Sequence, residues 1–186
     1  MKKILIVSGH PDLNDSFANK TILEEVHKLL PEAEIACLDQ LYPDFQIDVQ
    51  KEQERLLRAD IIVLQYPLFW YTAPSLLHRW IEKTFTHGFS HGKTGDKLKG
   101  KQLVLSFTAG APEEMYSPEG PQQHSIDDFL TPYKQMAHLC QLQWSGYVFS
   151  GGLSYASRHD EKELARMKEK SIRHAQLLVE KLKGME

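Results

Sequence analysis

Residues 8–17, SGHPDLNDSF, follow an apolar run and bring together groups that can bind an anion. His10 supplies an imidazole, and Ser16 supplies a hydroxyl at the start of a predicted helix. Free backbone N–H groups and the positive end of the helix dipole meet at such a position, so a phosphate would fit there. The segment lacks GxGxxG and GxxxxGK, which disfavours a dinucleotide fingerprint and a P-loop. The alternative interpretation is that Asp15 or Ser16 is an ordinary helix N-cap and His10 a loop histidine.

A second unusual loop, LQYPLFWYTAP at residues 64–74, follows another apolar run. The side chains of Phe69, Trp70 and Tyr71 alternate in direction, so they cannot all point into one core. Flat apolar side chains in a loop stiffened by two prolines can stack on a planar cofactor. The alternative is that Phe69 and Trp70 pack under the following helix or lie in a subunit interface.

A third loop, TAGAPEEMY at residues 108–116, begins with small residues. Ala109, Gly110 and Ala111 allow backbone amides to approach a ligand closely, and Tyr116 can donate a hydrogen bond. By itself this segment is equally consistent with a mobile loop whose glycine only makes a turn. Together, the three loops supply a phosphate cradle, a stacking wall and amides for the polar edge of a ring. This combination favours flavin mononucleotide (FMN), which would carry the redox chemistry.

Five predicted strands alternate with helices and would position these loops. Apolar runs place the strands at residues 3–7, 35–38, 60–65, 102–108 and 143–151. Helical spacing and capping residues place helices at residues 16–30, 48–59, 74–85, 126–130 and 131–140, and a last one beginning at Asp160. This alternation predicts an open parallel sheet covered on both faces, in which ligands bind at the carboxyl ends of the strands. The three loops follow the first, third and fourth strands and should therefore converge.

Composition limits the other possibilities. With 186 residues and a net charge of −3, the chain fits one domain, residues 1–186, and offers no basic surplus for nucleic acid. The two cysteines, Cys37 and Cys140, form neither a disulfide framework nor a CxxC metal motif. Its apolar runs are too short for a signal peptide or a membrane span, so we expect a cytoplasmic protein.

Several long stretches resemble the flavodoxin-like NAD(P)H:quinone oxidoreductases, especially their short bacterial branch. That branch contains general-stress quinone reductases, modulators of drug activity and ancillary flavoproteins of glutathione-gated potassium efflux. The matching stretches are GHPxxxxSxAN at residues 9–19, LYPDFxID at 41–48, PLxWYxxPxLLxxWIEKxF at 67–85, HGFSHG at 87–92 and YSPEG at 116–120. The resemblance implies an α/β, flavodoxin-like fold: a doubly wound five-stranded parallel sheet of order 2-1-3-4-5 with helices on both faces.

The resemblance also implies how the flavin is held. The phosphate and ribityl chain would be bound by residues of the first loop: His10, Ser16, Phe17, Ala18 and Asn19. The isoalloxazine ring would be lined by residues of the aromatic loop: Pro67, Leu68, Phe69 and Trp70. The pyrimidine edge of the ring would form hydrogen bonds with the third loop: Thr108, Ala109, Gly110 and Ala111. The family's usual Thr-Thr-Gly-Gly is replaced here by residues 108–111, and a common Gln is replaced by Phe69. Backbone-mediated binding survives both changes.

Further residues are assigned to the reaction by the same resemblance. Tyr116 matches a tyrosine that helps balance charge on the reduced flavin, whereas Gln122 stands where the relatives have a histidine, and nearby His124 is a candidate replacement. Tyr71, His87, Phe89 and His91 are expected on the substrate or dimer-partner side. Although two of these histidines are four residues apart, the glycines beside them disfavour a helix, so no metal site is predicted.

The leading hypothesis is a homodimeric NAD(P)H dehydrogenase (quinone) with FMN, although FAD is possible. Hydride would pass from NAD(P)H to flavin N5, and two electrons would then pass to a quinone or similar acceptor in a ping-pong exchange. The alternative is an ancillary regulatory protein of a glutathione-gated potassium efflux system, partnered with a membrane antiporter. A one-electron carrier is disfavoured because a net charge of −3 is weakly acidic for docking redox partners. The preference between NADH and NADPH is left open.

Overall fold

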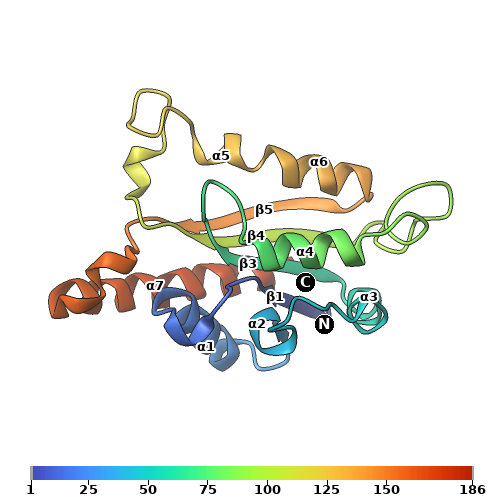
Figure 1. Ribbon diagram of the computed structural model, residues 1–186, viewed down its shortest axis with the longest axis horizontal. Helices are drawn as coiled ribbons and strands as arrows, with labels where there is room; N and C mark the ends of the chain where they lie inside the picture. The colour runs from blue at the N-terminus through green and yellow to red at the C-terminus, as the bar shows by residue number, and fades with distance from the viewer. Residues whose placement is uncertain (1, 186) are drawn as a thin grey trace.

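The computed structural model describes residues 2–185, which contain one sheet of five parallel strands. In chain order the strands are β1 (Ile4–Ser8), β2 (Glu34–Cys37), β3 (Ile61–Pro67), β4 (Gln102–Thr108) and β5 (Gln143–Ser150). Their spatial order is β2-β1-β3-β4-β5, so the predicted order 2-1-3-4-5 is confirmed (Figure 1).

The three central strands are buried on both faces, which explains why their sequences are continuous apolar runs. Every residue of β1 and β3 is buried, whereas the edge strands β2 and β5 are partly exposed. β5 also contains an irregularity opposite Leu103 and Leu105, where Gly146 adopts a φ of 79°. A glycine accommodates this left-handed conformation without the strain of a Cβ atom.

Helices cover both faces of the sheet, as predicted (Figure 1). They are α1 (Ala18–Leu29), α2 (Leu38–Leu41), α3 (Val49–Arg58), α4 (Ser75–Thr84), α5 (Ile126–Phe129), α6 (Thr131–Leu139) and α7 (Glu161–Lys183). Helices α1 and α7 pack on one face, and α3, α4 and α6 pack on the other. Short 3₁₀ helices, η1 (Leu13–Asp15), η2 (Glu113–Met115) and η3 (Tyr155–His159), lie in the loops; neither these nor α2 was predicted.

Side-chain caps begin several helices where the sequence indicated. The Asp48 carboxylate accepts from the backbone N–H of Lys51, and the Asp160 carboxylate accepts from the N–H groups of residues 162 and 163. Helix α1 begins two residues later than predicted, but the Ser16 hydroxyl still accepts from the N–H of Asn19 at 3.2 Å. Ser16 is therefore both a capping residue and available at the end of the first loop.

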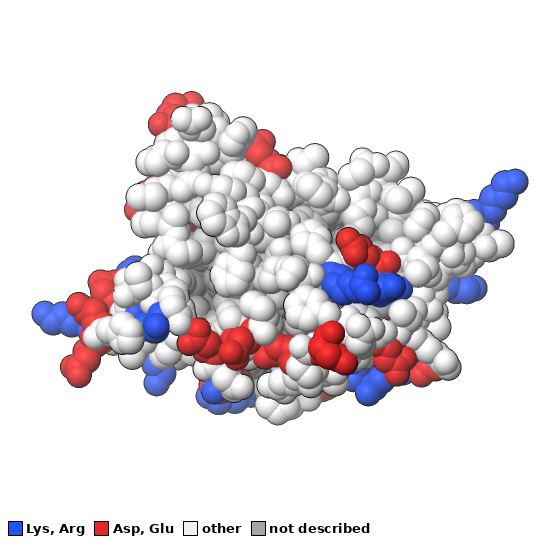
Figure 2. Space-filling view, viewed as in Figure 1, with Lys and Arg blue, Asp and Glu red and all other residues white. Residues whose placement is uncertain are grey.

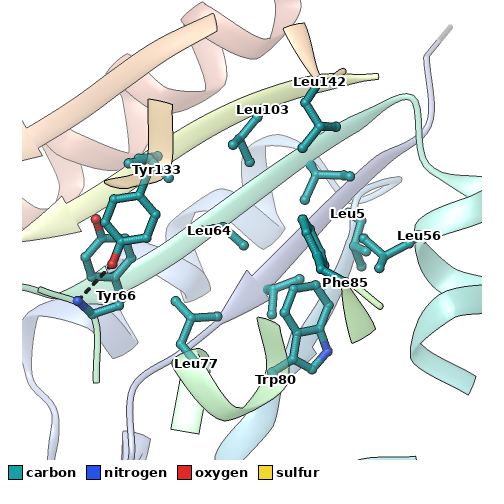
Figure 3. Packing of buried hydrophobic residues seen from close by; sticks show 14 of the residues in the cluster. Leu5, Leu56, Leu64, Tyr66, Leu77, Trp80, Phe85, Leu103, Tyr133 and Leu142 are labelled. Carbon is teal, nitrogen blue, oxygen red and sulfur yellow. Dashed lines mark hydrogen bonds between the residues drawn. The ribbon is translucent and has the colours of Figure 1, made fainter. Parts of the chain in front are cut away.

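The core on the α4–α6 face contains Tyr133, which anchors the aromatic loop (Figure 3). The same core also encloses a buried polar cluster around Glu52. Glu52 is fully buried, and its carboxylate accepts from Trp80 Nε1 at 2.9 Å and from the Tyr42 hydroxyl at 2.7 Å. The Tyr133 hydroxyl accepts from the backbone N–H of Ala73 at 3.0 Å. This contact attaches the end of the aromatic loop to α6.

Within residues 2–185, no helix combines the length and the apolar composition needed to cross a membrane.

Candidate functional site

A cavity of about 540 Å³ opens at the carboxyl ends of β1, β3 and β4, beside the β1/β3 pair at which the strand order reverses. The three loops singled out from the sequence therefore converge. The cavity is lined by His10, Pro11, Asp12, Asp15, Ser16, Phe17, Ala18, Asn19, Pro67, Leu68, Phe69, Thr108, Ala109, Gly110, Leu153, Tyr155, Arg158 and Met167. Of the thirteen residues assigned to the cofactor from the sequence, only Trp70 and Ala111 lie outside this lining.

His10 and Ser16 form the polar end of the cavity. His10 is 8% exposed, and its Nδ1 accepts from the backbone N–H of Asp12 at 3.1 Å. Burial lowers the pKa of His10 below its usual 6.5, although Asp39, Asp12 and Asp15 oppose this shift. In the neutral ring Nδ1 is an acceptor, so the proton is on Nε2, and the Ser16 hydroxyl hydrogen is free to donate. Both groups can donate to an anion.

A chain of buried side chains supports this end of the cavity. Asn19 Nδ2 donates to Thr108 Oγ1 at 3.2 Å, and Gln65 Nε2 donates to Asn19 Oδ1 at 2.6 Å. The Ser8 hydroxyl continues the chain to Gln65 Oε1 at 3.5 Å. These contacts join α1 to β1, β3 and β4, so Asn19 positions the loops through both ends of its amide. Gln65 was missed in the sequence, where a polar residue inside the apolar run IIVLQYP was the available signal.

The aromatic loop turns back on itself in a way that separates its three rings. Phe69 and Thr72 exchange backbone hydrogen bonds of 2.9 and 3.1 Å, and Trp70 and Tyr71 have positive φ values of 50° and 66°. Phe69 lines the cavity, and its ring meets His10 edge-on with centroids 6.1 Å apart. Trp70 is 91% exposed and points away from the cavity. Of these two residues predicted to line the ring, Phe69 therefore lies in the cavity lining and Trp70 lies outside it.

Trp70 instead lines a second groove of about 600 Å³ on the outer side of the same loop. This groove continues along α4 past His78, whose Nε2 is 2.8 Å from Thr72 Oγ1. Phe69 lines both spaces and separates them.

The third loop presents backbone donors at the other end of the cavity. The backbone N–H of Ala109 donates to Ser150 O, and Ala109 O accepts from the N–H of Leu153, both at 3.0 Å. Among residues 2–185, the N–H groups of Gly110 and Ala111 have no hydrogen-bond acceptor. Gly110 is exposed and Ala111 is half-buried, so both amides can be hydrated in the free protein and are available to a ligand.

Tyr116, His124 and Tyr71 meet beside the cavity, around a ring that was missed in the sequence. Phe129 on α5 stacks with Tyr71 at 5.1 Å and meets Tyr116 and His124 edge-on at 6.3 and 5.8 Å. Burial and the neighbouring Tyr71 raise the pKa of Tyr116. His124 is mostly exposed, with Nδ1 3.9 Å from the Asp128 carboxylate. None of these side chains lines the cavity itself.

His87, Phe89 and His91 lie at the opposite end of the sheet from the cavity, because α4 carries the chain back to the amino ends of the strands (Figure 1). The segment is not helical: Gly88 and Gly92 have φ values of 83° and 89°, and the two histidine rings meet edge-on at 5.7 Å. Within one protomer these residues therefore cannot reach the cavity. Among residues 2–185, no three His, Cys, Asp or Glu side chains are grouped to hold a metal ion.

The parallel sheet and its cavity at the β1/β3 switch point define a flavodoxin-like protein. A family model described as Flavodoxin-like fold matches residues 2–175, and the chain belongs to this family. It is 42% identical over 141 residues to the glutathione-regulated potassium-efflux system ancillary protein KefF of Enterobacter sp. (strain 638), covering 76% of this chain and 78% of that protein. It is 35% identical over 163 residues to the corresponding ancillary protein KefG of Cronobacter sakazakii, covering 88% and 86%.

A solved structure shows what a relative of this shape binds. The general stress protein 14 of Treponema denticola, crystallised in complex with FMN, has a TM-score of 0.85 and 26% identity, covering 96% of this chain and 98% of that chain.

Proposed function

We propose that this protein is an FMN-dependent NAD(P)H:quinone oxidoreductase. One observation carries the proposal: three loops line a single cavity in which the first supplies anion donors, the second an apolar wall and the third a free backbone amide at Gly110. The FMN complex of the Treponema denticola relative supports the choice of cofactor.

The residues present fit FMN. Small-molecule sites commonly measure about 300–1,000 Å³, and this cavity measures about 540 Å³. His10 and Ser16 would hold the phosphate, Leu68 and Phe69 would contact the ring, and the amides of residues 110 and 111 would bind its polar edge. Bound FMN would accept a hydride from NAD(P)H and return two electrons to a quinone or similar acceptor.

The protein's own residues orient the cofactor and control access to it. Asn19 and Gln65 fix the spacing between the phosphate end and the Thr108 loop. Tyr116 stays protonated because burial raises its pKa, so its phenol can donate a hydrogen bond on the substrate side. His124, which is mostly exposed and contacts the same Phe129 ring as Tyr116, would act beside it.

We also propose that the active assembly is a cytoplasmic homodimer. The exposed Trp70 ring and the groove beside it offer apolar surface for a second copy. His87, Phe89 and His91 could contribute to an active site only in that second copy, because they lie at the opposite end of their own sheet. Sedimentation of the purified protein should give twice the mass of one chain, and a monomeric species would contradict this part of the proposal.

The central test is to identify the flavin released from denatured protein and then to reduce the bound flavin with NADH and NADPH separately. We expect one FMN per chain, rapid bleaching of the flavin absorbance and reoxidation by a soluble quinone. His10→Ala should lose FMN, whereas His27→Ala, an exposed histidine on α1, should retain it. Protein that binds neither FMN nor FAD, or a bound flavin that no nicotinamide reduces, would refute the proposed function.

A second candidate function is that of an ancillary regulatory protein for a potassium efflux system. It is favoured by the 42% and 35% identities to KefF and KefG. Co-purification with a membrane potassium antiporter, and altered potassium efflux when the gene is deleted, would support it. Normal efflux in the deletion strain would remove this candidate while leaving the enzymatic proposal intact.

A further inference from the structure

The cavity has one cationic side chain that the sequence did not assign to the cofactor. Arg158, on η3 between β5 and α7, is the single Lys or Arg among the lining residues. Asp12 and Asp15 line the same end of the cavity, and Asp39 lies close enough to act on the pKa of His10. A flavin phosphate bound by His10 and Ser16 would therefore enter a region where carboxylates predominate.

Acidic side chains also form a band across the face shown in Figure 2, with uncharged residues above its left part and a group of Lys and Arg side chains above its right part. Anions are repelled by such a surface unless a nearby cation compensates for it. The donors of the first loop are neutral hydroxyl and backbone groups, together with an imidazole whose pKa is lowered by burial. The first loop therefore contributes no permanently charged cation that could compensate for the carboxylates around a bound phosphate.

Arg158 is held beside the cavity without being neutralised. Its guanidinium carbon lies 3.5 Å from the centroid of the Tyr155 ring, and its Nη1 donates to Tyr155 O at 3.3 Å. Within residues 2–185 it forms no ion pair, although Asp12 and Asp15 line the same cavity. Stacking on an aromatic face orients a guanidinium and leaves its edge free for hydrogen bonds to an oxyanion.

Tyr155 connects this arginine to the first loop. Its hydroxyl donates to Asp15 Oδ2 at 2.7 Å, joining two segments that are 140 residues apart in the sequence. This bond holds the Asp15 carboxylate against Tyr155, and no ion pair forms between Asp15 and Arg158 among residues 2–185. It also fixes η3 across the polar end of the cavity.

We propose that Arg158 is a phosphate-binding residue and that Tyr155 positions it, so that η3 acts as a clamp on the phosphorylated end of the flavin. This inference rests on the proposed function, because it requires a flavin in the cavity. It predicts that the clamp recognises the phosphate and not the ring. Charge-assisted hydrogen bonds from an arginine to phosphate are strong and bidentate, so the effect should be large.

The test compares FMN with riboflavin, which has the same ring and ribityl chain but no phosphate. Dissociation constants of both flavins would be measured by quenching of flavin fluorescence. The proteins compared are the wild type, Arg158→Gln, Arg158→Lys and Tyr155→Phe. The control is Arg173→Gln, which alters an exposed arginine of α7 outside the cavity. We expect Arg158→Gln to weaken FMN binding by about tenfold or more, equivalent to about 1.4 kcal/mol or more. Its riboflavin affinity should change by less than about twofold.

The other variants of η3 should weaken FMN binding less than Arg158→Gln, and the Arg173→Gln control should bind FMN like the wild type. Arg158→Lys should recover part of the FMN affinity because it restores the charge but not the planar fork. Tyr155→Phe, which keeps the ring and removes the bond to Asp15, should weaken FMN by only about threefold. The FMN affinity of the wild type should fall with added NaCl more steeply than that of Arg158→Gln, since one charge pair has been removed.

Two negative outcomes are distinguishable. The clamp is overturned if the wild type binds FMN and Arg158→Gln binds it equally well. It is also overturned if Arg158→Gln loses affinity for FMN and for riboflavin to the same extent. Either result leaves the proposed function standing. A wild type that binds no flavin overturns both.

Discussion

His174 makes the stability of the fold depend on pH in a way that can be calculated. It lies on α7 and is fully buried, with Nε2 2.9 Å from Ser106 Oγ on β4 and Nδ1 2.9 Å from Ser150 Oγ on β5. A neutral imidazole satisfies both hydroxyls, donating through one nitrogen and accepting through the other. Burial lowers the pKa of His174 to about 4, although the Glu113 carboxylate opposes the shift.

The sign of the effect follows from the lowered pKa. In the unfolded chain His174 binds a proton at a pKa of about 6.5, whereas in the folded protein it does so only at about 4. Its contribution to stability is therefore complete above about pH 6.5 and is lost as the pH falls toward 4. At 1.36 kcal/mol per pH unit, the loss is about 2 kcal/mol at pH 5 and about 3 kcal/mol at pH 4.

Urea unfolding of the flavin-free protein at about pH 7.5 and about pH 5 would measure this loss. His174→Gln supplies an amide that can donate to one serine and accept from the other without titrating. The wild type should lose about 2 kcal/mol more than His174→Gln between the two pH values, and a His27→Gln control should behave like the wild type. Parallel losses in wild type and His174→Gln would refute the reasoning.

Three further predictions concern the core and the first loop. Glu52→Ala leaves the Trp80 indole N–H without its buried acceptor, so the free energy of unfolding in urea should fall by about 3 kcal/mol. An unchanged free energy of unfolding would contradict the prediction, because it would mean that the Trp80 N–H finds another partner when Glu52 is removed. Gly9→Ala places a Cβ atom 2.6 Å from Leu77 Cβ, and should lower that free energy by about 1–3 kcal/mol; a neutral result would mean that α4 shifts easily. His10 should bind FMN as a neutral donor, because burial lowers its pKa and its Nδ1 already accepts from the backbone N–H of Asp12. FMN affinity measured by titration should therefore show the same pH dependence in the wild type and in the weaker-binding His10→Gln; a steeper fall with rising pH in the wild type would contradict it.

Much of the fold was predictable because its strands and helices are encoded locally. The runs that form β1, β3 and β4 are continuous and apolar, as parallel strands covered on both faces must be. Asp48 and Asp160 begin helices through hydrogen bonds to residues two or three positions away, so their role could be read from short segments. The sheet order followed from the resemblance to a known family.

Several features of the site depend on contacts between distant segments, which no local pattern specifies. Trp70 was assigned to the ring wall, yet the positive φ values at residues 70 and 71 turn its side chain outward. Gln65 was predicted only as the last residue of a strand, and its role depends on α1, which places Asn19 against it. His87 and His91 lie near the aromatic loop in sequence but at the other end of the sheet, because α4 separates them from it.

The sequence by itself determined where the five strands and the longer helices form, and therefore which three loops follow β1, β3 and β4, since propensity, capping and apolar periodicity act over a few residues. Only the tertiary structure decided which side chains face the cavity. The η3 segment meets the first loop through the Tyr155–Asp15 bond, across 140 residues, and Arg158 thereby lines the same cavity as His10 and Ser16. Such a contact exists only in the folded protein, because the packing of α7 against α1 places the two segments side by side.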